Sequence, residues 1–171
     1  DYYTLLMQDF DPTHISDVVL AKGTDYNYRV GFIDFFSDTR SLFNYTATFA
    51  KGSFYNGNIT SFEGHATYRY QPYLNMTMNF SYNDIKLPGN FEHARFWLLG
   101  PKLDLTLSEK VFFQSYVQYN EQIDNMNINL RFQWRYKPVS DLFIVYTDNY
   151  YTGNWTSRNR ALVVKLSYWF N

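Results

Sequence analysis

Charged and titratable side chains recur at every second position in several segments. Glu63, His65 and Arg69 share one parity within residues 61–70, and so do Lys102 and Asp104 further along. A histidine near a carboxylate could serve as a general acid or base, but catalysis would also need a nucleophile and an orienting group beside it. Because Ser and Thr fill the same parity in most of these segments, their spacing singles out no catalytic set. We therefore predict no catalytic residues from the sequence.

A second polar group lies near the amino end, where Asp9, Asp11 and His14 fall within six residues. Oxygen ligands of this kind suit Ca²⁺, but the spacing does not match the EF-hand pattern, which needs more ligands and a glycine. The sequence has no cysteine, no glycine-rich phosphate loop and no zinc-type spacing. We predict an ordinary polar loop here, with no metal and no cofactor.

The elements that position these side chains have a period of two. In residues 127–137, Ile128, Leu130, Phe132, Trp134 and Tyr136 alternate strictly with amide and basic residues. Alternation of this kind predicts a β-strand with one apolar and one polar face. Its eleven residues also match a tilted strand across a bilayer, which needs about 9–11 residues.

The same alternation recurs along the whole chain and predicts about ten strands. The expected strands are residues 2–8 (a short, clipped first strand), 26–32, 43–49, 61–70, 74–82, 97–107, 113–120, 127–137, 142–150 (with ambiguous faces) and 162–170. Tight turns alternate with connections of more varied length, as they do in up-and-down barrels. We predict an all-β fold in one domain, residues 1–171: a transmembrane antiparallel up-and-down β-barrel of about ten strands, or the C-terminal ten strands of a larger barrel.

Composition supports a membrane location and excludes other classes. Aromatic residues make up 22% of the chain and charged residues only 18%, against about 25% charged residues in typical soluble domains. No apolar run reaches the roughly 18 residues of a transmembrane helix, and barrel strands hide their apolar half in the average because they alternate. A net charge of −1 argues against nucleic acid as a partner.

Polar residues of the expected strands should face the barrel lumen. The predicted lumen-facing set is Arg29, Glu63, His65, Arg69, Lys102, Asp104, Arg131, Arg135 and Lys165. In a narrow barrel these charges would pair with one another, and in a wide one they would line water. The Asn-x-Ser/Thr triplets within strands follow from the same alternation and are not interpreted as glycosylation sites.

The last strand ends in aromatic residues. Its apolar face carries Leu166, Tyr168 and Phe170, and only Asn171 follows. This end resembles that of outer-membrane barrels, whose last strand is bound by the barrel-assembly machinery. The resemblance implies a bacterial outer-membrane protein whose signal peptide has been cleaved. Its partners would be outer-membrane lipid, lipopolysaccharide, the assembly machinery and other outer-membrane proteins.

Several stretches between Gly52 and Phe170 resemble one particular family. The family comprises Bacteroidetes-type outer-membrane proteins with an N-terminal domain like carbohydrate-binding family 9 and a C-terminal barrel of unassigned function. The stretches that carry the resemblance are 52–57, 68–73, 80–85, 117–120, 127–136, 140–146 and 160–166. The family's barrel is longer, so these strands correspond to its C-terminal portion. The carbohydrate-binding-like domain is absent here, so its glycan binding does not transfer.

Three functions remain open from the sequence. The first is a pore, transport or scaffold component of the outer membrane. The second is a membrane-embedded hydrolase with a site at the outer rim, similar to omptin proteases, for which the rim offers Asp9, Asp11, His14, Glu92, His93 and Asp124. The third is a soluble lipocalin-like barrel, which the uniformly aromatic and aliphatic face disfavours because a cup lined by so many rings would have no cavity.

Overall fold

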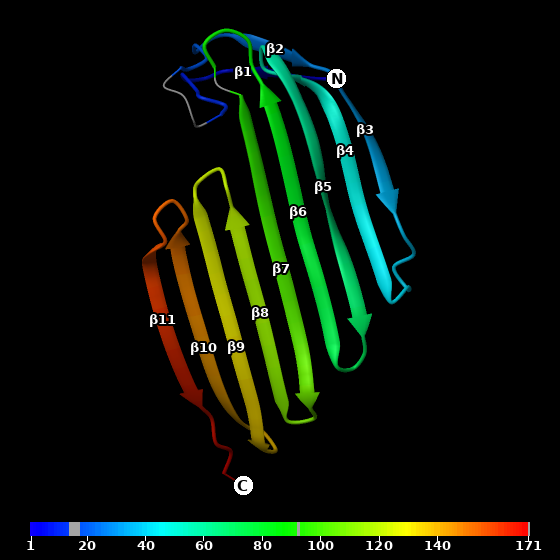
Figure 1. Ribbon diagram of the computed structural model, residues 1–171, viewed down its shortest axis with the longest axis vertical. Coiled ribbons are helices and arrows are strands. Elements are labelled where there is room, and N and C mark those ends of the chain that lie inside the picture. Colours follow the sequence, from blue (N-terminus) through cyan, green and yellow to red (C-terminus); the bar gives the residue numbers. More distant parts are fainter. Residues whose placement is uncertain (14–17, 92, 171) are drawn as a thin grey trace.

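A computed structural model of the chain describes residues 1–13, 18–91 and 93–170. This part is all-β, and no helix in it is long and apolar enough to cross a membrane. Eleven strands form two antiparallel sheets, one of two strands and one of nine (Figure 1). The strands are β1 (Tyr2–Leu5), β2 (Asp25–Tyr28), β3 (Val30–Phe36), β4 (Phe43–Phe54), β5 (Gly57–Tyr70), β6 (Leu74–Lys86), β7 (Ala94–Ser108), β8 (Val111–Asn120), β9 (Asn125–Lys137), β10 (Ser140–Tyr151) and β11 (Thr156–Leu166).

The nine-stranded sheet is a simple up-and-down meander. Its order, β11-β10-β9-β8-β7-β6-β5-β4-β3, follows the chain, so each strand pairs with its sequence neighbours. The predicted all-β, antiparallel, up-and-down arrangement is therefore confirmed. The sheet is open: β3 and β11 form its two edges and lie on opposite sides of it (Figure 1).

Two ends of this sheet can be distinguished. At the turn end, short connections join β3 to β4, β5 to β6, β7 to β8 and β9 to β10. At the loop end, the other four connections and the β1–β2 sheet are found (Figure 1). The turns at 71–73, 109–110 and 138–139 are tight, as the alternation of turns and loops predicts.

The register of the hairpins gives the nine-stranded sheet two continuous faces. Cross-strand partners lie on the same side of a sheet, so the pairing register assigns every strand residue to one face. We call the side that carries Leu130 and Phe132 the apolar face, and the side that carries Asn129 and Arg131 the polar face. Strand β10, whose faces were ambiguous in the sequence, places Leu142 and Ile144 on the apolar face and Phe143 on the polar face.

The structure corrects the prediction of one strand over residues 26–32. This region is divided at Arg29: β2 pairs with β1, and β3 pairs with β4. With Arg29 predicted to face the lumen, a period of two over 26–32 predicts Val30 and Phe32 on the apolar face. This is also wrong, because they pair with Gly52 and Ala50 on the polar face. The apolar positions of β3 are taken by its odd-numbered residues instead. Apolar residues occur on both parities there, so the period of two carried no usable signal.

Strand β7 contains Pro101, and because proline has no backbone N–H we expect irregular pairing there. The pairing of β7 with β8 runs through Leu99 and resumes at Lys102, omitting Gly100 and Pro101. The pairing with β6 is continuous, with Met78 opposite Pro101. The expected irregularity is confirmed and is confined to one side of the strand.

Aromatic packing ties the amino-terminal segment to the loop end. The ring of Tyr55, in the β4–β5 turn, lies 4.7–5.7 Å from the rings of Phe10, Tyr26, Tyr28 and Phe54. A small buried cluster of Ile85, Ala94 and Phe96 lies near the same end, on the polar face. The β1–β2 sheet is thus fixed to the sheet end by side-chain contacts.

Candidate functional site: the two faces of the sheet

The polar face gathers most of the residues that the sequence predicted to face a lumen. Eight of the nine lie there, on β5, β7, β9 and β11. They are Glu63, His65, Arg69, Lys102, Asp104, Arg131, Arg135 and Lys165. The exception is Arg29, which lies between β2 and β3, outside both strands, where its exposed guanidinium forms an ion pair with Asp1 at 3.3 Å. The sheet thus brings together on one surface residues that are up to a hundred positions apart.

Polar residues of β5 bond to neighbouring hydroxyl and carbonyl groups. The Nδ1 atom of His65 lies 3.0 Å from the Thr46 hydroxyl on β4. Arg69, at the turn end, donates to the carbonyl oxygens of Thr39 and Ser41, and so holds the β3–β4 connection. The hydrogen-bond partners of His65 and Arg69 thus lie on β4 and in the β3–β4 connection respectively.

An acidic centre lies on β7. Asp104 lies 3.3 Å from the Lys102 ammonium, and it accepts hydrogen bonds from Gln114 at 3.0 Å and Asn75 at 3.4 Å. Neighbours on three strands therefore converge on one carboxylate. Its charge is thus compensated within the sheet.

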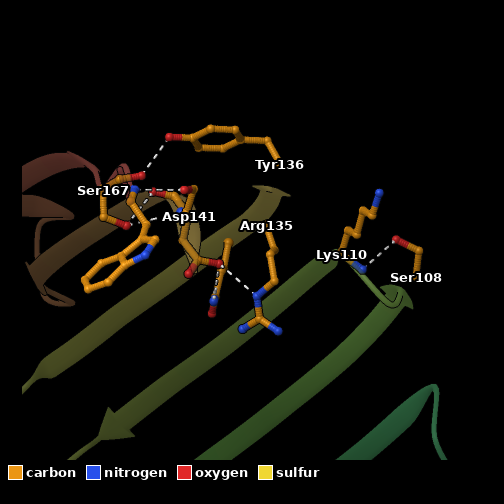
Figure 2. Close-up of polar contacts among 9 residues, drawn as sticks. Ser108, Lys110, Arg135, Tyr136, Asp141 and Ser167 are labelled. Carbon is orange, nitrogen blue, oxygen red and sulfur yellow. Dashed lines mark hydrogen bonds and ion pairs between the residues drawn. The ribbon is translucent and has the colours of Figure 1, made fainter. Parts of the chain in front are cut away.

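At the turn end a hollow is lined by Lys110, Arg135, Lys137 and Asp141. The Nε atom of Arg135 lies 3.3 Å from Asp141 Oδ1, which also accepts a bond from Gln133. Figure 2 shows Arg135 and Tyr136 directed to opposite sides of the end of β9. With only Asp141 and Glu109 to balance three cations, the hollow has a net positive lining.

A row of amide side chains crosses four strands near the loop end. The register places Gln118, Asn127, Asn149 and Asn159 opposite one another, and Asn149 donates to Asn127 at 2.7 Å. This row was not predicted from the sequence, because the faces of β10 were ambiguous and Asn159 fell between two expected strands. Only the cross-strand register, which aligns the four residues, reveals the row.

The apolar face has a regular banding along the strands. Its middle carries aliphatic, aromatic and small residues, with Ser115 and the Asp148–Arg160 pair as polar exceptions. Tyr and Trp flank this band at both ends: Tyr45, Tyr68, Tyr70, Trp134 and Tyr136 towards the turn end, and Tyr82, Trp97, Tyr119 and Tyr150 towards the loop end. Two rows of amphipathic rings around an apolar band are typical of a surface that crosses a membrane.

Charged strand residues on the apolar face lie towards its loop end, and Asp148 lies just inside the aromatic row, between Tyr146 and Tyr150 on β10. The buried carboxylate of Asp148 lies 2.6 Å from the Arg160 Nε atom and accepts hydrogen bonds from Tyr146 at 2.6 Å and Ser157 at 2.7 Å. This cluster, which links β10 to β11, was not predicted from the sequence. The pairing of Asp148 with Arg160 across the hairpin supplies the compensation that a buried charge needs.

The rim residues proposed for a hydrolase do not converge in the described part of the chain. Asp9 accepts from the Lys22 N–H at 2.8 Å, and Asp11 bonds the hydroxyl of Thr13, so both support their own loop. His93 contacts Asp84 through Nε2. His14 and Glu92 lie outside the described residues. Within those residues, no group of three or more His, Asp or Glu side chains is arranged to hold a metal ion.

The carboxyl end differs from the sequence prediction in its length. Strand β11 ends at Leu166, so Tyr168 and Phe170 lie beyond it. After Leu166 pairs with Leu142, the Ser167 N–H bonds the Asp141 carbonyl, and β10 has almost no residues left to pair. The rings of Tyr168 and Phe170 pack against each other at 4.6 Å, and the Lys137 ammonium lies over Tyr168.

Comparison of the chain with family models, curated proteins and solved structures found no match in any of the three.

Proposed function

We propose that the chain is an integral β-barrel component of the bacterial outer membrane. Its apolar face would contact lipid, and its polar face would border an aqueous or side-chain-filled interior. The observation that carries this proposal is the apolar face, with its central band between two rows of Tyr and Trp. The family resemblance noted in the sequence points the same way.

The exposure of this face supports the proposal. Leu162, Val164 and Leu166 on β11 are 61–67% exposed, and Trp97 and Trp134 are 42% and 44% exposed. Contiguous apolar patches on soluble monomers rarely exceed a few hundred Å². A continuous apolar surface across nine strands would be unfavourable in water and stable in lipid. Strands β4 to β11 have 10–15 residues each, which suffices for a bilayer core.

Within this proposal, the role is a pore, transport or scaffold function. The polar face supports it with ion pairs, amides and hydroxyls rather than with a convergent catalytic set among the described residues. Two ion pairs, Lys102–Asp104 and Arg135–Asp141, compensate charges on this face. Partners would be lipid, lipopolysaccharide, the assembly machinery and other outer-membrane proteins.

Adjacent residues of opposite parity test the membrane proposal. The chain has no cysteine, so Phe80→Cys and Asn79→Cys each provide one labelling site, on the apolar and the polar face respectively. In outer-membrane vesicles, a fluorophore at position 80 should be quenched by a lipid-chain quencher, and one at position 79 by a water-soluble quencher. Equal access of the water-soluble quencher to both would refute membrane insertion. Conductance in a planar bilayer would then distinguish a pore from a scaffold.

A hydrolase at the loop-end rim is the second candidate, favoured by the contact between His93 and Asp84. A carboxylate that orients a histidine is the usual arrangement of a general base. Under this proposal His93→Ala should abolish hydrolysis of a peptide or ester substrate while leaving assembly intact. Activity that survives this substitution would eliminate His93 as the base.

A further inference from the structure

Strand β1 occupies only part of an edge that continues along β3. It pairs with β2, with Tyr2 opposite Tyr28 and Thr4 opposite Tyr26. A single residue, Arg29, separates the end of β2 from the start of β3. Beyond Arg29 the edge has no partner strand in the nine-stranded sheet, and six of the seven β3 residues are exposed.

Backbone hydrogen bonds show that the edge of β2 that pairs with β1 and the free edge of β3 are formed by residues of the same parity. Residues of an antiparallel strand alternate in the neighbour to which they direct their N–H and C=O groups. In β3, the odd positions bond to β4, because the Ser37 N–H donates to Tyr45 and the Arg29 carbonyl accepts from Ser53. The even positions, Val30 to Phe36, therefore direct their backbone groups to the free edge.

In the β1–β2 sheet it is also the even positions that face β1. The Leu6 N–H donates to the Thr24 carbonyl at 3.0 Å, in the register that pairs Tyr2 with Tyr28. The edge of β2 that β1 covers and the free edge of β3 thus continue into each other with unbroken parity. A strand that extended β1 backwards would meet unpaired backbone groups all along β3.

The first residue of the chain already follows this register. The β1–β2 pairing, continued by one residue, places Asp1 opposite Arg29, and their side chains form an ion pair at 3.3 Å. The next residue back would lie opposite Val30. Seven residues would suffice to cover Val30–Phe36.

Strand direction gives an independent reason for one added strand. In a meander of nine strands the first and last run the same way, and β3 and β11 do so in Figure 1. Direct closure would make them a parallel pair, whereas bacterial single-chain barrels are antiparallel with an even number of strands. One strand antiparallel to β3 is antiparallel to β11 as well.

We propose that polypeptide on the amino side of Asp1 continues β1 along the free edge of β3, in the same register, and forms the tenth strand of the sheet. Its second, fourth and sixth residues before Asp1 would lie opposite Gly31, Ile33 and Phe35, on the apolar face. This strand would then pair with β11. The pairing of this strand with β3 does not depend on membrane insertion. Its pairing with β11 rests on the proposed barrel function.

Disulfide formation in the protein that carries its own residues before Asp1 tests the register. Positions opposite odd residues of β3 would be non-hydrogen-bonded pairs, whose Cα atoms are about 4.5 Å apart and can be bridged. A cysteine four residues before Asp1, combined with Ile33→Cys, should therefore form an intramolecular disulfide under mild oxidation. The matched control moves the first cysteine to three residues before Asp1, which places it on the other face, and should give at least tenfold less disulfide.

Three results would overturn the proposal. The first is an intact mass showing that the mature chain begins at Asp1. The second is an equal disulfide yield for the two cysteine positions before Asp1. The third is a disulfide between Ile33→Cys and a cysteine at Leu162, Val164 or Leu166, in one chain or between two copies. The quenching experiment on Phe80→Cys and Asn79→Cys is read separately. A register disulfide without lipid quenching would retain the tenth strand and refute the membrane proposal.

Discussion

The two faces of the nine-stranded sheet are built from the same strands and differ in almost every physical respect. On β9, Leu130 lies on the face that has an aliphatic centre and two aromatic rows, and Asn129 lies on the face with ion pairs and amides. Charges on the polar face lie in the middle of the strands and towards the turn end, while those on the apolar face lie towards the loop end. This difference supports the proposed membrane insertion, in which each face would contact a different solvent.

The largest effect is expected from a charge placed at the centre of the apolar face. Leu130→Arg should lower the free energy of unfolding by about 2–4 kcal/mol, because a basic residue on a lipid-contacting face is that unfavourable at the bilayer midplane. Asn129→Arg, one residue away on the polar face, is the matched control and should change it far less. Urea titrations of the two variants, folded in lipid vesicles, measure the difference. Similar losses for both would mean that the faces do not contact different solvents.

Two glycines test how closely the strands pack on each face. A methyl group at Gly64 would lie 2.1 Å from the Thr46 carbonyl oxygen and 2.8 Å from the Ala47 Cα atom. Gly64→Ala should therefore destabilise the sheet by about 1–3 kcal/mol, as overpacking does. At Gly100 the nearest atoms are 3.6 Å away, so Gly100→Ala should be almost neutral. The denaturation midpoints of both variants measure these effects. An unchanged midpoint for Gly64→Ala would show that β4 and β5 can move apart at little cost in stability.

The smallest effect is expected for the ion pair on the polar face. Lys102 and Asp104 are 3.3 Å apart, with side chains 49% and 26% exposed. A double-mutant cycle with Lys102→Ala and Asp104→Ala should give a coupling of about 0.2–1 kcal/mol that decreases with added salt, as for a solvated pair. A larger, salt-independent coupling would place the pair in a narrow interior filled by side chains, and so would favour a scaffold over an open pore.

Strong alternation made most of the sheet predictable. Strand β9 was predicted at residues 127–137 and spans Asn125–Lys137, because eleven residues of strict period two admit only one division into faces. Eight predicted polar residues lie on one face for the same reason. Strand β10 has apolar residues on both parities, and only its pairing with β9 assigned its faces and revealed the Asp148–Arg160 cluster.

Because alternation and turn residues act locally, the sequence was enough to predict an all-β, up-and-down sheet, the approximate number of strands and most of the two faces. The division at Arg29, the end of β11 at Leu166 and the two open edges were visible only in the three-dimensional structure. These features depend on which strand is available as a partner. Backbone hydrogen bonds between strands are non-local, and a pattern within one strand does not specify where its neighbour begins or ends.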